Sequence, residues 1–78
     1  MKTVVKAKTD LNLALAKRVA ESAAGCASDI RVLTGNKSAN AKSLMGVIAL
    51  AFKKGAELIL YAEGKDAARA IEELKKLL

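Results

Sequence analysis

The side chain best placed to take part in chemistry is the hydroxyl of Ser43, which stands directly before the apolar stretch Leu44 to Ile48. A serine in this position is typical of a helix N-cap, because its oxygen can accept a hydrogen bond from a free amide of the first turn. Lys42 beside it and the apolar Leu44 and Met45 after it also fit a second interpretation. Ser43 would then accept a phosphoryl group at the edge of an exposed apolar partner surface.

Other chemistry-bearing motifs are absent from the sequence. Without histidine and with Cys26 as the single cysteine, the chain can form neither an internal disulfide nor a Cys/His zinc site. Cys26 lacks any accompanying motif and is interpreted as a buried small hydrophobe. No Gly-rich phosphate loop, paired-carboxylate motif or nucleophile elbow occurs. We therefore expect no metal, no cofactor and no catalysis by the chain itself, and a reducing cytoplasm as its compartment.

Length and charge narrow the class of protein further. A chain of 78 residues predicts one domain, residues 1–78, that buries roughly 60% of the surface of its unfolded form. Its net charge of +6 favours acidic partners, whether protein faces, phosphate groups or nucleic acid. Nucleic acid is the less favoured of these, because Phe52 and Tyr61 are the only aromatic residues and form no stacking platform. Neither a membrane span nor a signal peptide is expected.

The first half of the chain alternates between strand and helix patterns. Alternation over Thr3 to Lys8 predicts a half-buried strand, and apolar residues every three or four positions from Leu13 to Ala24 predict a helix. Asn12 is a good N-cap for this helix, and Gly25 is expected to close it in a left-handed conformation. Two strands, Asp29 to Leu33 and Lys37 to Asn40, should then form a hairpin around a tight turn.

The second half predicts two more helices and one more strand. The helix after Ser43 is expected to end near Lys53–Gly55, where two lysines would oppose the negative end of its dipole. Glu57 to Glu63 has apolar residues on both faces and predicts a central strand. Asp66 to Leu78 predicts an amphipathic helix with a Glu72–Lys76 ion pair. The order βαββαβα indicates an α+β fold in which three helices cover one face of a four-stranded, mainly antiparallel sheet.

With these elements in place, the sequence resembles the HPr family, the histidine-containing phosphocarrier proteins of the bacterial sugar phosphotransferase system. The resemblance covers essentially the whole chain and is strongest over Gly35–Leu50, Lys54–Leu58 and Ala62–Gly64. The Ser-Leu-Met-Gly-Val stretch that begins at Ser43 is similar to the Gram-positive branch, in which an ATP-dependent kinase phosphorylates the matching serine. The resemblance implies an open-faced β-sandwich with the same βαββαβα order.

One motif of the family is altered here. The family's Gly-Leu-His-Ala/Thr-Arg-Pro-Ala corresponds to Asp10–Ala16, with Asn12 in the place of the histidine, Ala14 in that of the arginine and Leu15 in that of the proline. Phosphate relay needs a free nitrogen lone pair, which imidazole with its pKa of about 6.5 supplies. The lone pair of an asparagine amide is delocalised into its carbonyl. We therefore expect no relay and interpret Asn12 as a cap, with a weak anion site at this helix start as a minor alternative.

The resemblance also implies partners. They are HPr kinase/phosphorylase, acting on Ser43, and a LacI-type catabolite control repressor that reads the phosphoserine together with an apolar helix patch. The alternative to an apolar partner patch is that Leu15, Leu44 and Ile48 belong to the core. The partner surface, matched onto this sequence, comprises Asn12, Leu13, Ala14, Lys17, Glu21, Ser43, Leu44, Met45, Gly46, Ile48 and Ala49.

Two other functions remain open from the sequence. An alanine-rich start to the first helix and the absence of proline also fit a catalytically dead or engineered HPr scaffold without a partner. The positive charge fits a basic module for an anionic partner, which would bind nucleic acid with an affinity that falls steeply with salt.

Overall fold

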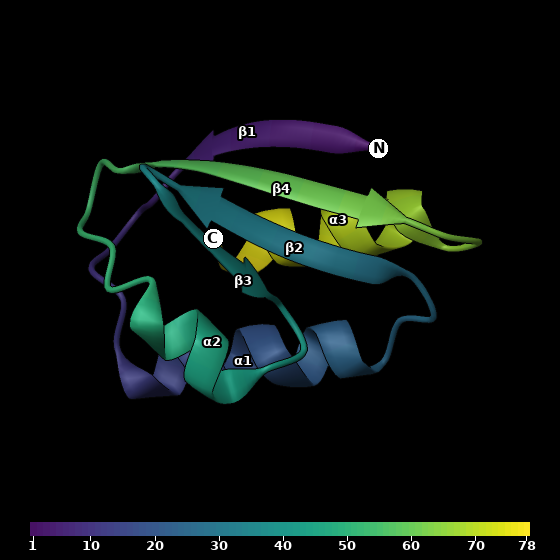
Figure 1. Ribbon diagram of the computed structural model, residues 1–78, viewed down its shortest axis with the longest axis horizontal. Coiled ribbons are helices and arrows are strands. Elements are labelled where there is room, and N and C mark those ends of the chain that lie inside the picture. The colour runs from purple at the N-terminus through teal and green to yellow at the C-terminus, as the bar shows by residue number, and fades with distance from the viewer.

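Four antiparallel strands form one sheet, and three helices pack on one of its faces (Figure 1). The computed structural model describes residues 1–78, with the strands in the spatial order β1-β4-β2-β3. The predicted α+β open-faced sandwich with the order βαββαβα is confirmed. Its elements are β1 (Lys2–Lys6), α1 (Leu13–Ala24), β2 (Asp29–Thr34), β3 (Lys37–Asn40), α2 (Leu44–Ala49), β4 (Glu57–Glu63) and α3 (Ala67–Leu77).

The sheet is organised around β4, which lies between β1 and β2 as the sequence predicts for a central strand. Because side chains alternate along a strand, Leu58 and Leu60 are fully buried beneath the helices while Ile59 and Tyr61 lie on the open face. Leu60 pairs with Thr3 on one side and Val32 on the other. This register puts the apolar residues of β2 and β4 on the same face.

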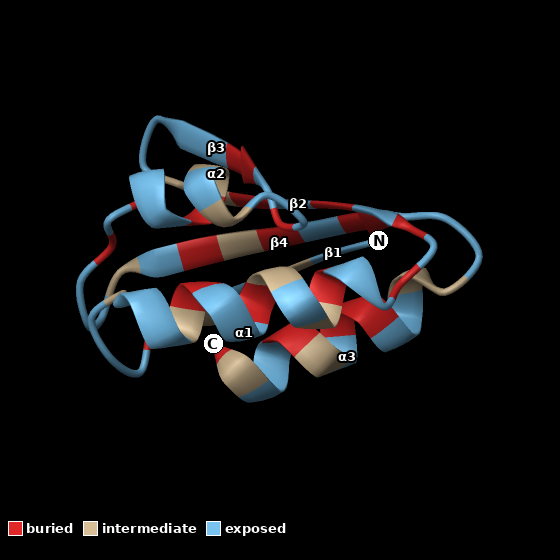
Figure 2. Cartoon of the chain, turned by 90° about the horizontal axis from the view of Figure 1, so that it is seen from below, coloured by how far each residue is buried: buried red, intermediate tan, exposed pale blue.

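The helices cover this face with stripes of small and branched residues. Val19 of α1 and Leu74 of α3 are completely buried, and Figure 2 shows the buried stripes of both helices turned toward the sheet. Burying one such side chain contributes about 1.5–3 kcal/mol. The lone thiol, Cys26, is 5% exposed and belongs to the same core, as predicted. None of the three helices is both long and apolar enough to span a bilayer.

The end of α2 differs from the prediction. The helix stops at Ala49 instead of near Lys53–Gly55, so no basic residue stands in its last turn. The reason lies in the core: Leu50 and Phe52 are 3% and 5% exposed. Residues two apart on a helix point in opposite directions, so both can be buried only if the helix breaks between them. The break occurs at Ala51, which has a left-handed φ of +46°.

Two smaller predictions are also wrong. Gly25 is right-handed, with φ −79°, because the last turn of α1 closes through bonds from the Gly25 and Cys26 amides to carbonyls three residues back. On α3 the predicted Glu72–Lys76 pair is replaced by a loose contact of 4.0 Å between the Lys75 ammonium and the Glu72 carboxylate.

Asp66 joins the start of α3 to the loop that follows α1. Its carboxylate accepts hydrogen bonds from the amides of Ala27 (2.8 Å) and Ser28 (2.9 Å), from the Ser28 hydroxyl, and from the Arg69 guanidinium (2.9 Å). The Ser28 hydroxyl, followed by the Ala27 amide, holds the pKa of the Asp66 carboxyl well below its ordinary value. Gly64 lies against this network, since a Cβ there would come within 2.8 Å of the Ser28 Cα.

The Asp66 network predicts acid-sensitive stability. The pKa of this carboxyl is lower in the folded chain than its unfolded value of about 3.9, so its contribution is complete above that pH and is lost as the pH falls below it. Asp66→Asn should therefore lower the urea midpoint at pH 7, and the difference from the parent chain should shrink below about pH 4. Glu72→Gln, which removes an exposed carboxylate on α3, is the control and should leave the midpoint unchanged. A pH-independent deficit in Asp66→Asn would contradict this account.

Candidate functional site

The predicted partner surface lies where α1 and α2 run side by side. From its start at Leu44, α2 runs back toward the beginning of α1 (Figure 1). A hollow of about 320 Å³ lies between the start of α1 and the end of α2. Its lining is Leu11, Asn12, Leu13, Ile48 and Ala51.

Asn12 caps α1, as predicted. Its side-chain oxygen accepts a hydrogen bond of 2.8 Å from the Leu15 amide, and its backbone is extended. The side chain is exposed, but its oxygen is committed to the helix and its nitrogen is an amide without a free lone pair. The chemistry available at this position is therefore limited to hydrogen bonding.

Ser43 caps α2, also as predicted. Its hydroxyl oxygen accepts a hydrogen bond of 3.1 Å from the Gly46 amide, and Gly46 leaves room beside it, since a Cβ there would lie 3.3 Å from the oxygen. Ser43 is exposed, and its oxygen retains one lone pair and its own hydrogen. An external base that removed this proton would make the oxygen a nucleophile.

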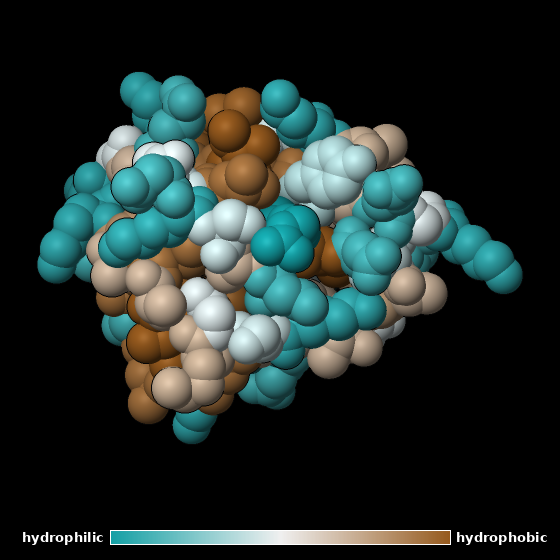
Figure 3. Space-filling model, in the orientation of Figure 1, coloured by the Kyte–Doolittle hydropathy of each residue, from teal (hydrophilic) through white to brown (hydrophobic).

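Three exposed side chains, Leu13, Met45 and Ile48, form what we call the α1–α2 patch. They are 55%, 76% and 37% exposed. Figure 3 shows apolar surface gathered at the lower left, over these two helices. The interpretation that Ile48 belongs to the core is wrong, because α2 turns its buried face, with Val47, toward the sheet. Leu15 and Leu44 are half-buried and pack against the core.

The structure does not bring all the predicted residues together. Glu21 lies farther along α1 and lines a separate hollow between α1 and α3. Ala14 lines another hollow, which it shares with Leu77 at the end of α3. The other predicted partner residues are exposed or half-buried on α1 and α2. They are Lys17, Leu44, Gly46 and Ala49.

Two residues that line the hollow were missed by the sequence analysis. Leu11 precedes the predicted cap and is not among the predicted partner residues. Ala51 falls within the helix that was expected to end near Lys53–Gly55 but stops before Ala51. The apolar character of Leu11 directly before a cap was the one signal in the sequence. The Leu11 amide donates a hydrogen bond to the carbonyl of Phe52, 41 positions along the chain. No local pattern reveals such a contact.

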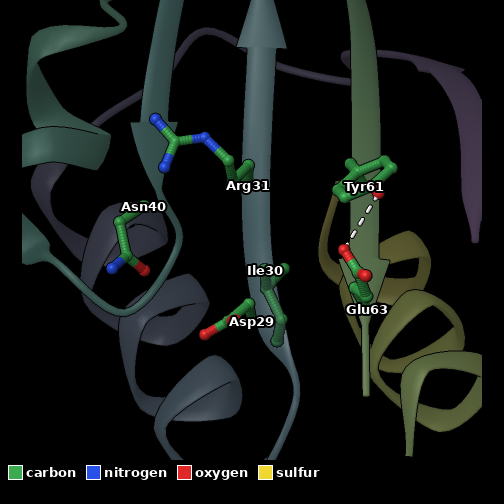
Figure 4. Close-up of a pocket in the computed structure, with 6 residues that line it drawn as sticks. All are labelled: Asp29, Ile30, Arg31, Asn40, Tyr61 and Glu63. Atoms are coloured by element: carbon green, nitrogen blue, oxygen red, sulfur yellow. Dashed lines mark hydrogen bonds between the residues drawn. The ribbon is translucent and has the colours of Figure 1, made fainter.

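The open face of the sheet carries a polar hollow of about 250 Å³, shown in Figure 4. Tyr61 donates a hydrogen bond of 3.2 Å to Glu63, which raises the pKa of the Tyr61 hydroxyl. Asp29 faces Glu63 across the strands, and Asn40 borders the hollow at the end of β3. The chain has no group of three or more His, Cys, Asp or Glu side chains that could hold a metal ion.

The four-stranded sheet with three helices on one face is an open-faced β-sandwich. A family model described as "PTS HPr component phosphorylation site" matches residues 1–78. The chain therefore belongs to the HPr family of phosphocarrier proteins of the phosphotransferase system. It contains no histidine.

Individual relatives agree with this family. The chain is 44% identical over 63 residues to the phosphocarrier protein HPr of Lysinibacillus sphaericus. The aligned residues cover 81% of this chain and 72% of the relative. The chain is 37% identical over 73 residues to the HPr-like protein Crh of Bacillus subtilis, covering 94% and 86%. The crystal structure of Crh, described as a catabolite repression protein, matches with a TM-score of 0.80. That of HPr from Bacillus anthracis matches with a TM-score of 0.93 at 30% identity, covering 100% of this chain and 95% of the other.

The cap at Asn12 generates a stability prediction. Asn12→Ala removes the acceptor of the Leu15 amide and should lower the free energy of unfolding by about 1 kcal/mol. Asn12→Asp retains the acceptor and adds a negative charge at the positive end of α1, so it should be at least as stable as the parent. Urea unfolding at pH 7 measures both. Equal losses in the two variants would show that the side chain does not act as a cap.

Proposed function

We propose that this chain is a regulatory HPr-like protein of carbon catabolite control that acts through phosphorylation of Ser43. The observation that carries the proposal is a contrast between two capped helix starts. Ser43 offers an exposed alcohol beside the α1–α2 patch, whereas Asn12 offers only an amide in a chain without histidine.

Histidine-dependent phosphate relay has no chemical basis in this chain. Asn12, which we align with the phosphohistidine of the family, has no nucleophilic nitrogen. Ala14, which we align with the family's arginine, cannot grip phosphate oxygens with a bidentate cation. Both substitutions act in the same direction, so the chain neither accepts nor passes on a phosphoryl group at this helix.

Phosphorylation of Ser43 requires no catalytic group in the chain itself. A base of HPr kinase/phosphorylase takes the hydroxyl proton, the Ser43 oxygen forms a bond to the γ-phosphorus of ATP, and the bond to ADP breaks. The product carries about −1.5 to −2 charges at the start of α2, where the helix dipole favours a negative group. The chain is thus a substrate and a ligand rather than an enzyme.

The phosphorylated form binds a LacI-type catabolite control repressor. Basic residues of the repressor contact the phosphoserine, and an apolar pocket receives the α1–α2 patch, whose three residues are too exposed to serve the core. The similarity to Crh, whose crystal structure is described as that of a catabolite repression protein, supports a role in catabolite control. We expect the chain to meet these partners in the cytoplasm. The proposed contact surface extends from Asn12 and Leu13 through Lys17 on α1 and from Ser43 through Met45 and Ile48 on α2.

The phosphorylation step is tested with ATP and purified HPr kinase/phosphorylase. We expect phosphate on the parent chain and none on Ser43→Ala, read by intact mass and by the position of the phosphopeptide. Phosphotransfer from phosphoenolpyruvate through the first enzyme of the phosphotransferase system should fail for both. An unlabelled parent chain, or label that survives Ser43→Ala, would reject the proposal and favour a scaffold without a partner.

Repressor binding is tested with the Ser43-phosphorylated chain. Met45→Ala removes the most exposed apolar side chain of the patch and should weaken binding by about 1–2 kcal/mol, roughly 5- to 30-fold in Kd. Val4→Ala is a matched control, because Val4 is also apolar and 51% exposed but lies on the open face of the sheet. Calorimetry or fluorescence anisotropy measures both. If Val4→Ala weakens binding as much as Met45→Ala, the docking face is misplaced.

A further inference from the structure

The segment that joins β3 to α2 consists of Ala41 and Lys42 and leads directly to Ser43. The amides of Ala41, Lys42 and Ser43 all donate hydrogen bonds. The Ala41 amide bonds to the Ile30 carbonyl at 2.9 Å, and the Ser43 amide bonds to the Asn40 carbonyl at 2.9 Å. Ala41 itself is completely buried. One end of the turn is therefore tied to the sheet through the core.

The middle of the turn depends on a side chain. The Lys42 amide has no backbone partner and donates instead to the side-chain oxygen of Asn40, at 2.9 Å. Asn40 thus holds two successive amides, that of Lys42 with its side chain and that of Ser43 with its carbonyl. Figure 4 shows its side chain at the end of β3, beside the open-face hollow and clear of the core.

We propose that Asn40 is a positioning residue for the modification of Ser43, because it holds the turn from which the serine is presented to its kinase. This inference rests on the proposed function of Ser43. A protein substrate whose reactive side chain is already ordered loses less conformational entropy on binding. The Asn40 side chain supplies this order locally, since Ala41 and the Ser43 amide keep their own bonds without it.

The local nature of the contact predicts a particular kinetic signature. Without the Asn40 oxygen, the turn becomes ordered only when the kinase binds. The conformational entropy lost at that step raises the free energy of the bound complex and of the transition state equally. Such a loss raises KM and leaves kcat unchanged. One hydrogen bond of about 0.5–1.5 kcal/mol corresponds to a change of roughly 2- to 10-fold.

The test compares three variants as substrates of HPr kinase/phosphorylase with ATP. Asn40→Ala should raise KM roughly 2- to 10-fold at unchanged kcat, and Asn40→Asp, which keeps an oxygen acceptor, should restore KM toward that of the parent. Ser38→Ala is the control, because Ser38 lies on the same strand and face but contacts Arg31 instead of the turn. Variants are compared well below their unfolding temperatures.

Hydrogen exchange of the Lys42 amide provides a second readout that does not involve the kinase. Exchange should accelerate in Asn40→Ala and return to the parent rate in Asn40→Asp. Suppose that the parent chain is phosphorylated but Asn40→Ala shows unchanged kinetics or unchanged exchange of the Lys42 amide. Either result would overturn this inference and leave the proposed function of Ser43 standing. A fall in kcat without a change in KM would also overturn this inference. A parent chain that takes no label would overturn the proposed function, and this inference with it.

Discussion

Burial of one face of the sheet is the constraint on which the rest of this structure depends. Ile30 and Val32 of β2 and Leu58 and Leu60 of β4 are all at most 1% exposed, and their strands are neighbours. This apolar face must be covered by a second layer, and in this chain the three helices form it. All three helices consequently lie on the same face, and α1 and α2 are in contact with exposed apolar side chains on their outer sides. The α1–α2 patch is therefore a consequence of covering the sheet.

This layer includes a helix that could not exist by itself. At six residues, α2 is far shorter than the 12–15 residues that an isolated helix needs in water. It is held by Val47, buried in the core, and by the Ser43 cap at its start. The serine proposed as the regulatory residue is therefore also part of what keeps the helix in place. Its oxygen can serve both roles, because the cap uses one lone pair and leaves the hydrogen free.

Asn12 and Ser43 show how similar structural roles can carry different chemistry. Each caps a helix with one side-chain oxygen, with distances of 2.8 Å and 3.1 Å to the amide it accepts from. An amide nitrogen cannot become a nucleophile near neutral pH, whereas an alcohol can when an enzyme supplies the base. In the proposed function, Ser43 is therefore the position that accepts phosphate in this chain, which has no histidine. Asn12 can still support the fold, because capping needs only an oxygen acceptor.

The sequence by itself determined the elements, their order and both caps. These depend on periodicity and on short polar side chains beside their own helices, which are properties of neighbouring residues. It also predicted β4 as the central strand, and the sheet places it between β1 and β2. Tertiary structure decided where α2 ends, since Leu50 and Phe52 reach the core only if the helix breaks at Ala51. It likewise decided that Ile48 is exposed and that Asp66 binds a loop 38 positions away. In such places contacts between distant segments override the local preference for helix. Helix propensity contributes only a few tenths of a kcal/mol at one residue, and core burial and buried hydrogen bonds contribute more.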